Sequence, residues 1–131
     1  MRELYPVYPV LVVDDEEHFL DSMKVTLQSN GLRNVECCLD SRTVMTRLRG
    51  KNYSLILLDI VMPPYINGDK LLPEIIKEYP HLPVFMMTGT IIEDEKREKF
   101  KDAGALDCLE KTISSETLIA VIRKALSNIG L

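Results

Sequence analysis

Short apolar segments alternate along the chain with longer segments whose apolar residues recur at helical spacing. The short segments are almost continuously apolar and rich in Val, Ile and Leu, which is typical of strands buried on both faces of a sheet. They predict five strands, at residues 10–13, 35–39, 55–58, 83–87 and 105–109.

The segments between and after these strands predict five helices, because apolar residues recur three and four positions apart in them. Thr90 and Glu93 fit a capping box that would open the fourth helix. Pro73 would interrupt the third helix, so we expect that helix either to begin near Lys70 or to be kinked. The predicted helices cover residues 17–30, 41–49, 68–79, 90–103 and 115–129.

The strict alternation of strands and helices predicts an α/β fold of the (βα)₅ type. Strands joined by helices must run parallel with right-handed crossovers, and helices then cover both faces of a central five-stranded parallel sheet. The chain has 131 residues, with no repeat and no linker. We therefore expect one domain over residues 1–131.

Composition narrows the classes of function. The chain is 46% hydrophobic and 27% charged, as in a globular protein, and its net charge is −4. An acidic surface argues against direct binding to nucleic acid or to an anionic membrane. No apolar run is long enough to span a bilayer, and the N-terminus does not resemble a signal peptide, so we expect a cytoplasmic location. The three cysteines lack the spacing of a zinc site and are expected to be reduced thiols.

Polar side chains follow four of the five predicted strands. Asp14, Asp15 and Glu16 follow the first strand, Asp59 the third and Thr88 the fourth, and Lys111 comes shortly after the fifth. The carboxyl ends of parallel strands meet at one edge of a sheet, where ligands bind near the switch in strand order. We therefore expect three of these acids, a hydroxyl and an ammonium in one pocket.

These residue types suit phosphoryl chemistry. Clustered carboxylates need a cation among them, and ligands that are all oxygen favour Mg²⁺. A carboxylate can attack phosphorus to form an aspartyl phosphate. A metal, a lysine and a hydroxyl can each bind one oxygen of the group being transferred.

In this order the strand-end motifs resemble those of the receiver domain of two-component response regulators. The matching stretches are VVDDE, LLDIVMP, MMTG and the lysine of DCLEK. The resemblance covers essentially the whole chain and implies a flavodoxin-like sheet of order 2-1-3-4-5. It implies that Asp59 is the phosphoacceptor and that Asp14, Asp15, Asp59 and the backbone carbonyl of Val61 hold Mg²⁺. Thr88 and Lys111 would bind the phosphoryl group.

The same resemblance implies partners and a mode of action. A histidine kinase or a histidine phosphotransfer domain would donate the phosphoryl group, and the domain would signal by a conformational change. It would catalyse only its own phosphorylation and dephosphorylation, and so would not be a conventional enzyme. An effector domain or a second copy would meet the face formed by the fourth helix, fifth strand and fifth helix.

Three features depart from the family pattern. Cys108 stands where the family usually has an aromatic residue that moves with the threonine. Thr112 replaces a proline that is often preceded by a cis bond, so we predict a trans Lys111–Thr112 bond, since a non-proline cis bond costs about 2.5–4 kcal/mol. The loop between Asp59 and Gly68 is one residue longer than usual and contains Pro63 and Pro64.

Other interpretations remain open from the sequence. The acids could be solvated turn or capping residues, and Lys111 could be an ordinary surface lysine. The domain could be a receiver-like docking module that is never phosphorylated. A phosphatase of the haloacid dehalogenase type would need an Asp-x-Asp motif after its first strand, whereas this chain has Asp14 and Asp15 adjacent.

Overall fold

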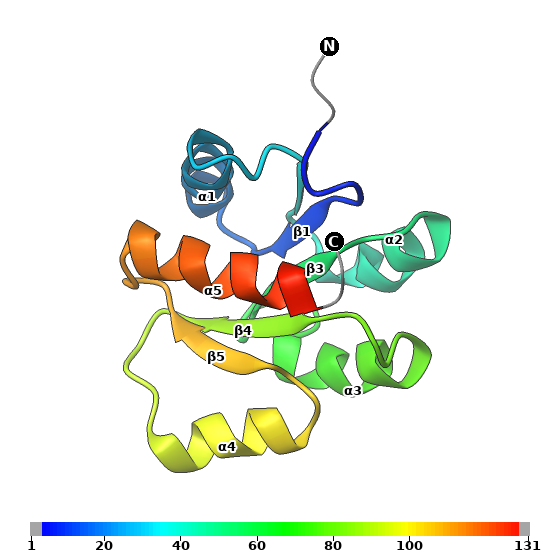
Figure 1. The fold of residues 1–131 in the computed structure, drawn as a ribbon. Coiled ribbons are helices and arrows are strands. Elements are labelled where there is room, and N and C mark those ends of the chain that lie inside the picture. The colour runs from blue at the N-terminus through cyan, green and yellow to red at the C-terminus, as the bar shows by residue number, and fades with distance from the viewer. Residues whose placement is uncertain (1–3, 129–131) are drawn as a thin grey trace.

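The computed structural model describes residues 4–128 as a sheet of five parallel strands with helices on both faces (Figure 1). The strand order is β2-β1-β3-β4-β5, so the predicted doubly wound fold is confirmed. The elements in chain order are β1 (Val10–Val13), α1 (Glu17–Ser29), β2 (Val35–Cys38), the 3₁₀ turn η1 (Ser41–Thr43), α2 (Val44–Gly50), β3 (Leu55–Asp59), α3 (Gly68–Glu78), β4 (Val84–Thr88), α4 (Asp94–Asp102), β5 (Asp107–Glu110) and α5 (Ser115–Asn128).

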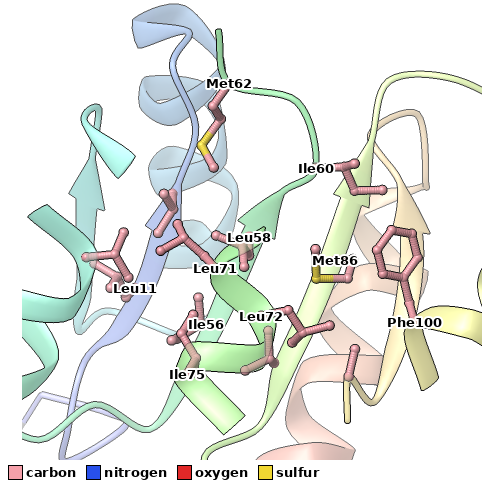
Figure 2. Close-up of a cluster of buried hydrophobic side chains, with 14 of the residues drawn as sticks. Leu11, Ile56, Leu58, Ile60, Met62, Leu71, Leu72, Ile75, Met86 and Phe100 are labelled. Atoms are coloured by element: carbon pink, nitrogen blue, oxygen red, sulfur yellow. The ribbon is translucent and has the colours of Figure 1, made fainter. Parts of the chain in front are cut away.

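The sheet separates two apolar clusters, because successive side chains on a strand point to opposite faces. On β3, Ile56 and Leu58 pack beneath α2, α3 and α4, whereas Leu55 and Leu57 pack beneath α1 and α5. Figure 2 shows part of the first cluster, in which Leu71 and Leu72 of α3 lie over the side chains of the strands. All residues of β1, β3 and β4 are buried, and each aliphatic side chain removed from water contributes about 1.5–3 kcal/mol.

Two helices begin later than predicted, α2 at Val44 after the 3₁₀ turn η1, and α4 at Asp94. The third helix begins at Gly68, as in its predicted range and not near Lys70, and contains Pro73 at its sixth position. The carbonyl of Asp69 thus has no N–H four residues on to accept from.

The fourth helix begins at Asp94 with Glu93 as its N-cap, and no side chain caps it, so the predicted capping box at Thr90 is wrong. The predicted end of the fifth helix, Ile129, lies outside the described residues.

The loop from β3 to α3 returns the chain tightly onto the strand it has just left. The Gly68 N–H donates to the carbonyl of Ile60 at 2.8 Å. A Cβ at Gly68 would lie 2.0 Å from the carbonyl oxygen of Asp59, closer than van der Waals contact allows. Only glycine fits this approach, and it fixes the start of α3 against the end of β3.

Candidate functional site

Four strand ends bring the predicted polar residues to one edge of the sheet. Asp14 directly follows β1, Asp59 ends β3, Thr88 ends β4, and Lys111 directly follows β5. Strands β1 and β3 are neighbours, so their two acids come together, and the lysine reaches them from the far edge of the sheet. The structure thus brings Asp14, Asp59 and Lys111 into contact, whereas Thr88 is placed only at the end of the strand next to β3.

Three carboxylates form a compact cluster. Asp14, Asp15 and Asp59 can each place one oxygen so that all three lie within 4.8 Å of one another. Asp14 is fully buried and Asp59 is 4% exposed, whereas Asp15 is exposed. The other Asp14 oxygen, Oδ1, accepts from the backbone N–H of Glu16 at 2.8 Å, and that bond orients the carboxylate. The Glu16 side chain is exposed and lies outside the cluster.

Lys111 is the cation of the site. Its Nζ lies 2.7 Å from Oδ2 of Asp14 and 3.3 Å from Oδ2 of Asp59, and its side chain is only 18% exposed. Its backbone N–H donates to the carbonyl of Thr88 at 2.7 Å, which ties the start of the β5–α5 loop to the end of β4. The ammonium thus bridges the two buried acids.

The electrostatics of the site favour added positive charge. Burial, reinforced by the nearby Asp14 carboxylate, raises the pKa of Asp59 from 3.8 to about 6, although Lys111 opposes the shift. Burial and Asp14 likewise raise the pKa of Asp15. Burial alone would lower the pKa of Lys111, but its contacts with Asp14 and Asp59 outweigh this and raise it. One ammonium therefore does not fully compensate three carboxylates.

The donor set fits Mg²⁺. The clustered ligand atoms are all carboxylate oxygens, the hard ligands that this ion prefers, and they carry more negative charge than Lys111 neutralises. A histidine or thiolate that would favour zinc is missing from the cluster found among residues 4–128. Asp14, Asp15 and Asp59 are thus suited to hold a magnesium ion.

The loop after Asp59 is shaped by hydrogen bonds to its own backbone. The Asn67 side-chain oxygen accepts from the N–H of Met62 at 2.7 Å. Val61, between Asp59 and this bond, has an exposed side chain. The part assigned to its carbonyl in holding a metal stays a prediction.

Thr88 lies at the end of β4 and is 9% exposed. Its hydroxyl lies 3.2 Å from the Thr90 hydroxyl and accepts from the Thr90 N–H at 3.2 Å. Thr90 therefore serves the strand-end turn instead of capping α4, which explains the failed capping box.

The departures from the family pattern are visible in the fold. Cys108 is fully buried in β5, within the cluster beneath α2, α3 and α4. Among residues 4–128 the cis peptide bonds are Tyr5–Pro6 and Pro63–Pro64, so the predicted trans bond between Lys111 and Thr112 is confirmed. The three cysteines are free thiols, as expected.

Sequence reasoning missed one aromatic side chain at the site. The Phe19 ring, in the first turn of α1, has its centroid 4.6 Å from Nζ of Lys111. In the sequence, Phe19 is one of the apolar residues of the helix predicted at 17–30, with nothing to mark it as part of a site. The two residues are distant in the sequence, so no spacing pattern could indicate their contact.

None of the helices within residues 4–128 combines the length and the apolar character that crossing a bilayer requires.

Comparison with known proteins identifies the family to which the chain belongs. The family model described as the response regulator receiver domain matches residues 10–123. The putative two-component response regulator ARR21 of Arabidopsis thaliana is 32% identical over 120 residues, which are 91% of this chain and 19% of that protein. The transcriptional regulatory protein ComA of Bacillus subtilis is 28% identical over 90% of this chain and 56% of its own length.

Solved structures of receiver domains are similar to this chain in fold and in sequence. The receiver domain of NtrX from Brucella abortus is 31% identical, with a TM-score of 0.81 over 90% of this chain and 98% of that one. The curated relatives are longer, and this chain spans 56% of ComA and 19% of ARR21. The match of the family model over residues 10–123, together with the fold, shows that the chain belongs to the response regulator receiver domains, the phosphoacceptor family of two-component signalling.

Proposed function

We propose that residues 1–131 form one receiver domain that accepts a phosphoryl group on Asp59 from a histidine kinase or a histidine phosphotransfer domain, acts in the cytoplasm, and signals by a conformational change. The observation that carries the proposal is the contact of the Lys111 ammonium with both buried acids, at 2.7 Å to Asp14 and 3.3 Å to Asp59. A surface lysine or a capping acid would not be held in this way.

The transfer follows from the chemistry of these groups. A carboxylate oxygen of Asp59 attacks phosphorus, the P–N bond to the donor imidazole breaks, and the bond's electron pair leaves with the imidazole. Lys111 and the Thr88 hydroxyl would each neutralise or bind one oxygen of the group in transit. Mg²⁺, held by Asp14, Asp15, Asp59 and the Val61 carbonyl, would supply charge neutralisation for the remaining oxygens. Attack by water on phosphorus later restores the Asp59 carboxylate.

The output would occur through the α4-β5-α5 face, toward an effector domain or a second copy of the chain. The longer curated relatives support the first alternative, since ComA is described as a transcriptional regulatory protein and this chain covers 56% of it. A solved relative described as the beryllofluoride-activated NtrC4 receiver domain dimer, 28% identical, supports the second. The domain itself would contact neither nucleic acid nor membrane.

Incubation with phosphoramidate or acetyl phosphate plus Mg²⁺ tests the proposal. The intact mass of the wild type should rise by one phosphoryl group, and Asp59→Asn should stay unmodified. Asp69→Asn, a change at an exposed acid in the first turn of α3, is the matched control and should be modified like the wild type. If no donor modifies the wild type, the domain is a docking module instead.

A further inference from the structure

The Phe19 ring lies beside the catalytic ammonium, yet it takes no part in the proposed reaction. Its centroid is 4.6 Å from Nζ of Lys111, within the distance of about 6 Å at which an ammonium is attracted to an aromatic face. Phe19 is half-buried and packs against the apolar cluster beneath α1 and α5, so the ring is itself held in place.

We propose that Phe19 is a positioning residue that holds the Lys111 ammonium at the two buried carboxylates, where a phosphoryl group arrives. This inference rests on the proposed function of Asp59 as phosphoacceptor. It gives Phe19 a part in the reaction without any contact with the substrate.

The path of the lysine side chain explains why it needs such a contact. Lys111 follows β5 at the edge of the sheet, and β4 lies between β5 and the strand that carries Asp59. A lysine side chain has many rotamers, and fixing it costs conformational free energy. The two acids attract the ammonium electrostatically, but this attraction is compatible with several rotamers of the side chain. The ring contacts the ammonium from the α1 side and reduces the number of rotamers that are allowed.

The ring contact is also independent of the acids. Asp14 and Asp59 are the residues suited to hold Mg²⁺, so their oxygens have a competing partner. The Phe19 ring has no such competitor, and its hold on Lys111 remains when the carboxylates are otherwise engaged. Leucine at this position would keep apolar packing but lack the negative face of an aromatic ring.

Phosphorylation by phosphoramidate separates this role from packing. Phe19→Leu should lower the maximal rate constant about fivefold, the factor that corresponds to about 1 kcal/mol of lost cation–π attraction. Phe19→Tyr keeps the aromatic face and should restore the rate. The matched control Phe100→Leu removes a ring from the other cluster and should leave the rate unchanged.

A second background tests whether the ring acts through the lysine. In Lys111→Met, which retains an unbranched stem but no charge, Phe19→Leu should cause no further loss of rate. An equal loss in both backgrounds, or a Phe19→Tyr variant as slow as Phe19→Leu, would overturn the inference.

Urea unfolding gives a readout that needs no phosphorylation. It compares four proteins: the wild type, Phe19→Leu, Lys111→Met and the double variant. The effects of Phe19→Leu and Lys111→Met on the unfolding constant should be coupled by about fivefold. If no donor modifies the wild type, the proposed function fails, and coupling of this size still shows that the ring holds the ammonium. Absence of coupling overturns the inference by itself.

Discussion

Asp59→Asn should stabilise the metal-free domain, although it removes the proposed phosphoacceptor. In the wild type, Asp59 is 4% exposed and lies beside Asp14, which is fully buried. Folding without a metal therefore carries an electrostatic cost that Lys111 only partly offsets. Asparagine has nearly the same shape and no charge, so it avoids that cost.

The pKa of Asp59 sets the magnitude of the effect. Burial and Asp14 raise this pKa from 3.8 to about 6 in the folded state. A carboxyl group with a raised pKa destabilises the fold at high pH, and the penalty disappears as pH falls toward the unfolded value. At about 1.4 kcal/mol per pH unit, Asp59→Asn should raise the free energy of unfolding by about 3 kcal/mol at pH 7 and by about half as much at pH 5.

Urea unfolding in the presence of a chelator measures this difference. Wild type and Asp59→Asn are compared at several pH values between 5 and 7, and only the difference between the two is used, so that titrating groups that do not interact with Asp59 cancel. The exposed Asp69→Asn change is the control; it removes only a charge at the N-terminus of α3 and should lower the stability, by at most about 1 kcal/mol, where Asp59→Asn raises it. If Asp59→Asn does not raise the free energy of unfolding at pH 7, or if the increase does not become smaller as pH falls, the ionised Asp59 carboxylate does not destabilise the fold and the reasoning is refuted.

Three further changes test the architecture around the site. Gly68→Ala should cost at least about 2 kcal/mol in urea unfolding, since its Cβ would lie 2.0 Å from the Asp59 carbonyl oxygen; an unchanged midpoint would contradict the close approach. Mg²⁺ should raise the melting temperature of the wild type, and Asp14→Asn should remove most of that rise; an equal rise in both would place the ion elsewhere. Leu57→Ala should cost about 2–5 kcal/mol in unfolding followed by circular dichroism, because the side chain is fully buried; a loss below that range would show that the site collapses around the missing atoms.

The fold was predictable because its pattern is local and repeated. Continuous apolar runs such as 55–58 indicate strands buried on both faces, and helical stripes between them leave few alternatives to a parallel sheet. The convergence of Asp14, Asp59 and Lys111 followed from the geometry of parallel strands alone. The strand order depended on the family resemblance.

The prediction for the start of the fourth helix was wrong because contacts with residues distant in the sequence determine where that helix begins. The start of α4 depends on Ile92, which is buried in the core, and on the Glu110 side chain, which accepts from the Ile92 N–H at 3.3 Å. A motif spanning Thr90 to Glu93 carries no information about those partners. The start of α3 at Gly68, by contrast, agrees with the predicted range, and the bond from the Gly68 N–H to the Ile60 carbonyl fixes it there although Pro73 then lies inside the helix.

The sheet keeps the packing beneath α1 and α5 apart from the packing beneath α2, α3 and α4, and within residues 4–128 the two clusters share no buried residue. Substitutions on opposite sides should therefore add in their effects on stability to within about 0.5 kcal/mol. A substitution beneath α1 should therefore leave the packing beneath α4 unchanged, because the helices cover different clusters. The strands act as a partition, so that each layer of helices can be altered while the other layer keeps its contacts.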